Sequence, residues 1–353
     1  MNARDWVRPE IAALSAYHVA DASGLIKLDA MENPFPLPAD LQAELAQRLA
    51  GAALNRYPDP HGGALPQQLR EAFAIPDGAS LILGNGSDEL ITLICQALAK
   101  PGATLLAAEP SFVMYRMNAV FSGLRYVGVP LTADFALDLP AMLAAVEAEQ
   151  PAVVFLAYPN NPTGPRYARA DIESILAAAP GMVVVDEAYT AFADDSFMNM
   201  AGTHPKLLVM RTLSKLGLAG IRLGYMAGPA DWIGELDKVR PPYNVNVLTQ
   251  TAAQFALAHL SVFTEQAAVL RAERARLSAA MAALPGVTVF PSEANFVLAR
   301  VPDAPRTFAA LKAAGILIKN LHGGHALLAN CLRFTVGTPD ENSRVLAALP
   351  NCL

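Results

Sequence analysis

One lysine stands in a short stretch whose neighbours could support chemistry. Lys215 follows an apolar, strand-like run that ends with Thr212 and Ser214, and Arg222 comes seven residues later. A lysine at the end of a buried strand loses hydration, so its pKa should fall and its amine should become a better nucleophile. Arg222 and the two hydroxyl groups could hold a phosphate. The alternative is an ordinary lysine whose stem lies along apolar residues.

Two further polar residues follow apolar runs of the same kind. Asp186 ends the run "VVVD", and Asn161 lies in "YPNNPTG". A carboxylate at the end of a buried strand is desolvated unless it is paired, so Asp186 indicates either a structural ion pair or a site for a cationic ligand atom. The sequence around Asn161 is typical of a plain turn, which could also hold an amide at the edge of the sheet.

A glycine-rich turn, "GNGSDEL", precedes a predicted helix that Ser87 would cap. Backbone N–H groups at Gly86 and Ser87 could bind a phosphate, because the first turn of a helix leaves such donors unpaired. Asp88 and Glu89 favour a plain helix start instead, since carboxylates stabilise this end of a helix and repel a phosphate.

The spacing of these residues predicts one shared site. Asn161, Asp186 and Lys215 are separated by 25 and 29 residues, which is room for about one strand and one helix in each interval. All three would then meet at the carboxyl edge of one sheet. The lysine can form an imine with an aldehyde, the aspartate can keep a pyridine nitrogen protonated, and the asparagine can donate to a phenolate oxygen. With a phosphate clamp, this set describes a pocket for pyridoxal 5'-phosphate.

Short apolar runs predict the strands that would position these residues. Seven occur, at 80–84, 104–109, 125–131, 152–158, 182–189, 207–212 and 223–228. Helical stretches lie between many of them, so we expect an α/β fold with a mostly parallel seven-stranded sheet covered on both faces, a three-layer arrangement. Before the sheet, 31–38 is rich in proline and irregular, and 38–51 predicts a helix that ends at Gly51.

The pattern changes after about residue 230. The alanine-rich stretch 246–283 predicts one long helix, and candidate strands follow at 286–290, 295–301, 315–321 and 331–337. This pattern is typical of a smaller α+β domain. We therefore expect three parts: an N-terminal arm with the first part of the small domain at 1–45, a large cofactor-binding domain at 46–235, and a small C-terminal domain at 236–353.

Composition excludes several kinds of protein. The 353 residues are 53% hydrophobic and 16% charged, enough for a sizeable core, and the net charge of -6 with no basic stripe argues against a nucleic-acid partner. Cys95, Cys331 and Cys352 are too far apart for a disulfide framework or a zinc site. His322 and His325 have no acidic or thiol partner nearby, so no metal is expected. The chain has neither a secretory signal nor an apolar run of membrane-spanning length, which favours the cytoplasm.

Taken together, the motifs resemble the fold-type I pyridoxal phosphate enzymes of the aspartate aminotransferase superfamily and, within it, the histidinol-phosphate aminotransferases. The resemblance covers about Tyr17 to Gly337 and rests on "LDAMENPFPLP", "NRYPDPHG", "GNGSDELI", "YPNNPTG", "VVVDEAY", "TLSKLGLAGIRLGY" and "LRFTVGTPDEN". It implies a homodimer that exchanges an amino group between histidinol phosphate and 2-oxoglutarate in histidine biosynthesis. A threonine-phosphate decarboxylase and an aromatic amino acid aminotransferase stay open, because the ring chemistry is common to all three.

The resemblance also implies roles for single residues. Lys215 would form the internal aldimine and move a proton, Asp186 would pair with the pyridinium nitrogen, and Tyr115 would stack on the ring. The phenolate oxygen would be contacted by Asn161 and Tyr189. The residues holding the cofactor phosphate would be Gly86, Ser87, Asp88, Thr212, Ser214 and Arg222, with Tyr57 of the neighbouring subunit. The substrate side would be lined by Tyr17, Asn33, Lys319 and Arg333.

Three features depart from the family pattern. Met31 stands in "MENP" where asparagine is usual, and Lys319 stands where an arginine usually lies near the substrate phosphate. A lysine keeps the charge of that arginine but loses its bidentate fork. The interval between Lys215 and Arg222 is one residue shorter than in the commonest form, which we interpret as a shortened loop that leaves the phosphate clamp in place.

Overall fold

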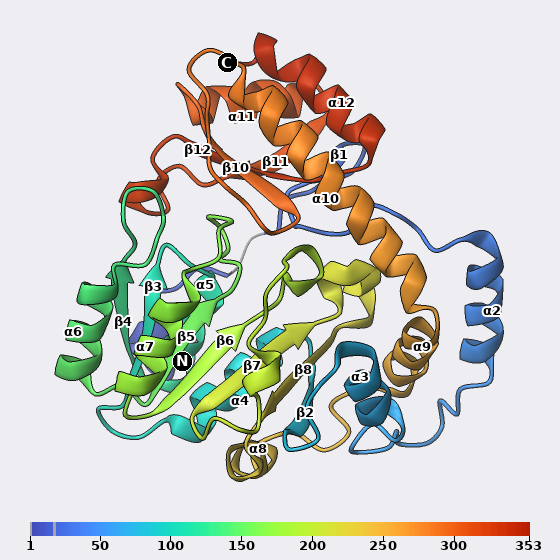
Figure 1. Ribbon diagram of the computed structural model, residues 1–353, viewed down its shortest axis with the longest axis vertical. Coiled ribbons are helices and arrows are strands. Elements are labelled where there is room, and N and C mark those ends of the chain that lie inside the picture. The colour runs from blue at the N-terminus through green and yellow to red at the C-terminus, as the bar shows by residue number, and fades with distance from the viewer. Residues whose placement is uncertain (1, 17–18) are drawn as a thin grey trace.

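A computed structural model describes residues 2–16 and 19–353, so the expected substrate residue Tyr17 lies outside the described residues. Figure 1 shows a large domain built around one sheet and a smaller domain packed above it. The long helix α10 (Leu260–Ala282) runs from the side of the large domain up to the small one.

The large sheet has the strand order β2-β8-β7-β6-β5-β3-β4. Its strands are β2 (Ser80–Asn85), β3 (Thr104–Glu109), β4 (Arg125–Pro130), β5 (Val153–Ala157), β6 (Met182–Asp186), β7 (Leu207–Thr212) and β8 (Leu223–Gly228). Strand β8 is antiparallel to both neighbours, and the other adjacent pairs are parallel. The predicted mostly parallel sheet is therefore confirmed. Strand β6 ends at Asp186, three residues earlier than expected, because the Asp186 carboxylate accepts the N–H of Ala188 and turns the chain.

Helices cover both faces of this sheet, because alternate strand residues point to opposite sides. Val184 belongs to the core beneath α4 (Ser87–Leu98), α5 (Val113–Ser122) and α8 (Ala230–Asp237). Val183 and Val185 belong to the core beneath α3 (Leu65–Phe73), α6 (Leu139–Glu149) and α7 (Arg169–Ala178). The three-layer α/β architecture expected from the sequence is thus present.

The small domain has a sheet of its own in the order β1-β11-β12-β10-β9. The strands are β1 (Ile26–Leu28), β9 (Thr288–Val289), β10 (Phe296–Arg300), β11 (Ile316–Asn320) and β12 (Cys331–Thr335). Helices α10, α11 (Ala304–Ala313) and α12 (Pro339–Ala348) pack on it. The sequence pattern did not predict β1, which has only three residues and gains its partners from β11, far along the chain.

The alanine-rich stretch 246–283 forms two helices and not one. Helix α9 (Val247–Ala258) ends just before His259, whose φ of -117° and ψ of 32° leave the helical range, and α10 begins at the residue after His259. Helix α9 packs against α2 (Ala39–Ala50) and α3, and Ala253 and Ala256 join the core of the large sheet. Because α9 packs with the large domain, we propose that the small domain begins with α10, later than residue 236.

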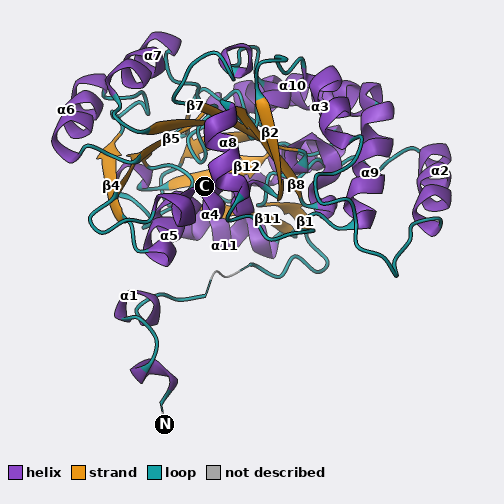
Figure 2. Ribbon diagram, turned by 90° about the horizontal axis from the view of Figure 1, so that it is seen from below, coloured by secondary structure: helices purple, strands orange, loops and turns teal. Residues whose placement is uncertain are grey.

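The N-terminal segment extends from one side of the molecule, as Figure 2 shows. Its short helix α1 (Pro9–Ala12) lies against α5, where the Arg8 guanidinium donates to the carbonyl of Phe121. Trp6 and Val19 are 78% and 72% exposed, which is unusual for large apolar side chains. Among the described helices, none is both long and apolar enough to cross a membrane.

A buried ion pair fastens the ends of β6 and β7 on the face turned away from α4. The Arg211 guanidinium lies 2.8 Å from the Glu187 carboxylate, with side chains that are 7% and 0% exposed. Glu187 also accepts the backbone N–H of Phe197 at 2.6 Å, and the Ser196 hydroxyl bridges the two charged groups. These bonds satisfy charges that would be costly to bury alone.

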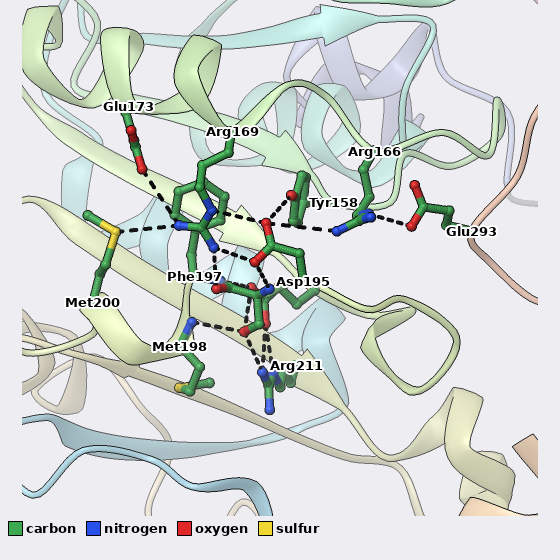
Figure 3. Close-up of polar contacts among 12 residues, drawn as sticks. Tyr158, Arg166, Arg169, Glu173, Asp195, Phe197, Met198, Met200, Arg211 and Glu293 are labelled. Atoms are coloured by element: carbon green, nitrogen blue, oxygen red, sulfur yellow. Dashed lines mark hydrogen bonds and ion pairs between the residues drawn. The ribbon is translucent and has the colours of Figure 1, made fainter.

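The network continues from this ion pair to the small domain (Figure 3). Asp195 accepts from the Arg169 guanidinium at 2.6 Å and from the Tyr158 hydroxyl at 2.8 Å. Arg166 lies 3.8 Å from the same carboxylate and 2.5 Å from Glu293, which lies on the loop between β9 and β10. The network therefore connects the loop after β5 with the small domain.

We expect Arg211→Met to lower the free energy of unfolding by about 3–5 kcal/mol, because Glu187 would stay buried without its partner. Urea denaturation followed by circular dichroism measures this change. Lys238→Met is the matched control, since it breaks the exposed pair with Glu235 and should cost less than about 1 kcal/mol. Equal stability of the two variants would contradict the structural role of the buried pair.

Candidate active site

The register of the parallel strands brings three chain turns to one edge of the large sheet. Ala157 at the end of β5 lies opposite Asp186, and Asp186 lies opposite Met210 in β7. The turns after these strands enclose a cavity. Many of the residues expected to hold a cofactor line it: Ser87, Asp88, Tyr115, Asn161, Asp186, Tyr189, Thr212, Ser214, Lys215 and Arg222.

Lys215 stands just beyond β7, in a π-helical turn over Ser214–Leu218. Gly217 has a φ of 132° in this turn, a conformation that side-chain-bearing residues rarely adopt. The Lys215 amine donates to the carbonyl of Ala30 at 3.1 Å. Burial and the positive charge of Arg333 lower its pKa to about 8. A larger fraction of this amine than of an ordinary lysine is therefore unprotonated near neutral pH and able to attack a carbonyl carbon.

Asp186 is held by neutral donors. One carboxylate oxygen accepts the Tyr115 hydroxyl at 2.7 Å, and the other accepts the Ala188 N–H at 3.1 Å. Burial raises the pKa of Asp186 to about 6, and these two hydrogen bonds oppose the rise. Within the described chain, Asp186 forms no ion pair with a lysine, arginine or histidine side chain. This arrangement favours a cationic ligand atom as its partner over the structural ion pair.

Tyr115 occupies a different place from the one expected. Its ring is fully buried and stacks on Phe155 at a centroid distance of 4.7 Å, with the hydroxyl on Asp186. Phe112 meets that ring edge-on at 5.6 Å and lines both the cavity and a second cavity beside it. The sequence prediction missed Phe112 as a residue of the site. Its position could have indicated it, because Phe112 lies just after the end of β3, as Lys215 lies just after the end of β7.

A cradle for an anion lies at the first turn of α4. Gly86 has a φ of 81°, and a Cβ there would lie 2.5 Å from an Arg222 nitrogen. A Cβ at Gly224 would lie 2.6 Å from the Ser87 nitrogen, so both positions require glycine. Arg222 donates to the Ser214 hydroxyl at 3.1 Å and to Asp88 at 3.3 Å. A guanidinium, hydroxyl groups and the N-terminus of a helix together suit a phosphate.

Thr212 supports the same cradle from the end of β7. Its hydroxyl oxygen lies 3.0 Å from the Ser214 hydroxyl and accepts the Ser214 N–H at 3.2 Å. Both residues are buried. The hydroxyl groups are therefore fixed before a ligand binds.

The second cavity brings two cationic side chains together. Lys319 and Arg333 are paired across β11 and β12, and both line this cavity with Met31, Phe112 and Asn161. The Arg333 guanidinium donates to the Asn161 side-chain oxygen at 2.6 Å and to the carbonyl of Asp29 at 2.9 Å. The two cavities share one wall, so an anionic group near Arg333 would lie beside whatever occupies the Lys215 cavity.

Two further residues that the resemblance assigns to the site, Asn33 and Tyr57, do not line the Lys215 cavity of their own chain. Asn33 donates to the carbonyl of Leu216 at 3.1 Å and to the Gln266 side chain at 3.0 Å, so it braces the turn that carries Lys215. Tyr57 is 80% exposed and stacks on Tyr243 at 4.5 Å, outside the cavity of its own chain. The cavity of a single chain therefore lacks the Tyr57 contact expected from the sequence.

The side chains of the two histidines near the second cavity accept hydrogen bonds from the backbone of the loop between β11 and β12. Nδ1 of His322 accepts the N–H of Asn330 at 3.0 Å, and Nδ1 of His325 accepts the N–H of Leu327 at 3.2 Å. Over residues 2–16 and 19–353, no group of three or more His, Cys, Asp or Glu side chains could hold a metal ion.

Comparisons with known proteins agree with this geometry. A sequence model described as "Aminotransferase class I and II" matches residues 23–349. A histidinol-phosphate aminotransferase of Chromobacterium violaceum is 70% identical over 349 residues, 99% of this chain and 98% of the relative. Histidinol-phosphate aminotransferase 2 of Cupriavidus pinatubonensis is 58% identical and covers 97% of this chain and 95% of its own.

A solved structure is similar over nearly the whole chain. It is the crystal structure of histidinol-phosphate aminotransferase from Sinorhizobium meliloti in complex with pyridoxal-5'-phosphate. The two share a TM-score of 0.87 and 25% sequence identity over 98% of this chain and 97% of the other.

We expect Lys215 to react with small amine-reactive reagents at a lower pH than an ordinary lysine, whose pKa is about 10.4. Reductive methylation across a pH series, read by mass spectrometry, should give half-maximal labelling of Lys215 near pH 8. Exposed Lys100 is the internal comparison. Arg333→Gln should move the Lys215 midpoint to higher pH, because it removes a nearby positive charge. A midpoint shared with Lys100 would contradict the lowered pKa.

Proposed function

The chain belongs to the class I and II aminotransferases, and we infer that it is a pyridoxal phosphate-dependent histidinol-phosphate aminotransferase. It exchanges an amino group between L-histidinol phosphate and 2-oxoglutarate, which gives imidazole acetol phosphate and glutamate in histidine biosynthesis. The supporting observation is structural: a nucleophilic lysine and a buried carboxylate share a cavity that adjoins two cationic side chains. Full-length identity favours this function over a threonine-phosphate decarboxylase or an aromatic amino acid aminotransferase.

The residues present fit pyridoxal phosphate. The glycine cradle beside Arg222 and Ser214 suits its phosphate, and the carboxylate of Asp186 lacks a cation that a ring N–H would supply. When bound, pyridoxal phosphate supplies an aldehyde that condenses with amines and a ring that withdraws electrons from the substrate Cα. Asn161 and Tyr189 line the same cavity and would contact the phenolate oxygen, and Phe112 would cover the ring.

Different residues of the chain would move the proton, keep the ring nitrogen protonated and hold the cofactor phosphate. Lys215, with a pKa of about 8, would take the proton from the Cα of the amino donor and deliver it to the cofactor carbon that carries the aldehyde, and it would move a proton in the opposite direction for the second substrate. Asp186 holds the proton of the ring nitrogen, and its burial strengthens that interaction. The Gly86–Ser87 turn, Ser214 and Arg222 fix the phosphate, so that the reacting carbon stays beside the Lys215 amine.

Arg333 and Lys319 would bind the anionic group of each substrate in turn. Glutamate brings an α-carboxylate, and histidinol phosphate brings a phosphate in its place. The planar guanidinium of Arg333 can accept either anion with two hydrogen bonds. Lys319 adds a second cation to the same cavity, in place of the arginine that the family pattern has.

We also propose a cytoplasmic homodimer. Tyr57 is exposed and lies outside its own cavity, as expected for a side chain that reaches the cofactor phosphate of the neighbouring subunit. The exposed apolar side chains of the N-terminal segment would lie in the subunit contact. Tyr17 would line the substrate side as the resemblance implies, whereas we now assign Asn33 to supporting the Lys215 turn.

The test of this function is an absorbance titration of purified protein loaded with pyridoxal phosphate. We expect glutamate and histidinol phosphate each to convert the visible band to that of the pyridoxamine form. Lys215→Ala should abolish turnover, because the Cα proton would have no base. A visible band that ignores histidinol phosphate would reject this substrate, and normal turnover by Lys215→Ala would reject the mechanism.

Substitution of Arg333 and of Lys319 should change KM for the two substrates differently. Arg333→Lys should raise KM for both glutamate and histidinol phosphate by roughly tenfold or more, because the bidentate hydrogen bonds to the anion are lost. Lys319→Met should raise KM for histidinol phosphate more than KM for glutamate, since a phosphate carries more charge than a carboxylate. Steady-state kinetics with each substrate measures both effects. Equal changes in KM for the two substrates in the Lys319→Met variant would contradict a role of Lys319 in binding the substrate phosphate.

A further inference from the structure

Tyr115 makes a contact that the roles assigned above leave unexplained. Its hydroxyl donates to an Asp186 oxygen at 2.7 Å, a short hydrogen bond to a carboxylate. Both side chains are buried, with Tyr115 0% and Asp186 4% exposed. Water therefore does not compete for this bond, and its effect on Asp186 is stronger than it would be at the surface.

The ring of Tyr115 is held so that its hydroxyl has little freedom to turn elsewhere. It stacks on Phe155 of β5 at 4.7 Å and meets the edge of Phe112 at 5.6 Å. Helix α5, which carries Tyr115, is fastened to α4 by a 2.7 Å hydrogen bond from Thr92 to Asn118. The donor is thus fixed by packing and does not depend on a ligand.

The Tyr115 hydroxyl matters for the protonation of Asp186, because other groups around Asp186 raise the pKa of its carboxyl. Burial raises the pKa of Asp186 to about 6, and the negative charges of Asp88 from α4 and Glu187 from the segment after β6 act in the same direction. The Tyr115 hydrogen bond is the first of the influences that oppose this rise. Burial and the negative charge of Asp186 in turn raise the pKa of Tyr115, so its hydroxyl keeps its proton and stays a donor.

A carboxylate and a pyridine nitrogen that share one proton compete for it. If the carboxylate binds protons too strongly, the proton moves to the oxygen and the ring becomes a neutral pyridine, a weaker electron sink. A hydrogen bond to the carboxylate stabilises its charged form and lowers its proton affinity.

Building on the proposed function, we propose that Tyr115 is a positioning residue whose hydroxyl, by donating to Asp186, keeps the shared proton on the ring nitrogen of pyridoxal phosphate. This role differs from stacking on the ring, which the structure leaves to Phe112. It requires the hydroxyl and not merely the aromatic ring of Tyr115.

The test compares Tyr115→Phe with wild type, both loaded with pyridoxal phosphate that carries ¹⁵N in its ring. In wild type, the ¹⁵N chemical shift should be that of a pyridinium. In Tyr115→Phe, it should move towards that of a neutral pyridine, and the dissociation constant for pyridoxal phosphate should rise about tenfold, as expected for one lost hydrogen bond to a charged group. Without cofactor, the pKa of Asp186, followed by ¹³C NMR, should rise above its wild-type value.

Tyr167→Phe is the matched control. Tyr167 is also a buried tyrosine, but its hydroxyl has no hydrogen-bond partner among the described residues. Its removal should leave the ¹⁵N shift and the cofactor affinity unchanged. A folded Tyr115→Phe protein with a pyridinium signal and wild-type affinity would overturn the proposal.

A second measurement decides the matter should Tyr115→Phe fail to fold. In cofactor-free wild type, the ¹³Cζ signal of Tyr115 should shift with a midpoint near pH 6 as Asp186 is protonated. A Tyr115 signal that does not follow the Asp186 titration would overturn the proposal. Failure of wild type to bind pyridoxal phosphate would instead reject the proposed function, while this titration would still test the contact.

Discussion

The burial of two adjacent carboxylates at the end of β6 is the constraint on which the site depends. Successive residues of a strand point to opposite faces, so Asp186 and Glu187 lie on different sides of the sheet edge. Glu187 meets the Arg211 guanidinium at 2.8 Å and is neutralised within the protein. Asp186 has only neutral donors among its hydrogen bonds. One carboxylate is thereby structural, and the other is available to a cationic ligand atom.

The site also depends on the contact between the two domains. Arg333 is on β12 of the small domain, and its guanidinium donates to Asn161 on the loop after β5 of the large domain. Arg166 and Glu293 pair across the same boundary, 2.5 Å apart. Arg333 and the amine of Lys215 therefore line adjoining cavities because the two sheets are held in one arrangement.

The sequence predicted the large sheet well because its strands are buried on both faces and read as uninterrupted apolar runs. The grouping of Asn161, Asp186 and Lys215 followed from parallel strands alone. Features set by tertiary contacts were missed. The break at His259 lies in a stretch where alanine favours helix throughout, and β1 is defined by pairing with a strand far along the chain.

Side-chain directions were the least predictable part of the site. Tyr115 and Phe112 are both aromatic residues after β3, and it is Tyr115, stacked on Phe155, whose hydroxyl meets Asp186. Asn33 carries a polar amide suited to a substrate, yet its donors are taken by Leu216 and Gln266. A motif gives the residue type at a position, whereas competition among neighbouring donors and acceptors decides what that residue contacts.

The pairing of Arg222 with Asp88 at the anion cradle has a consequence for how a ligand enters. Arg222 already has a counterion in the free protein, and its guanidinium lies beside Gly86 in this pairing. A phosphate bound here would compete with the carboxylate of Asp88 for Arg222, and the displaced carboxylate would stay at the N-terminus of α4, where the helix dipole stabilises it. Phosphate binding at this cradle would therefore exchange one anion for another beside the same cation.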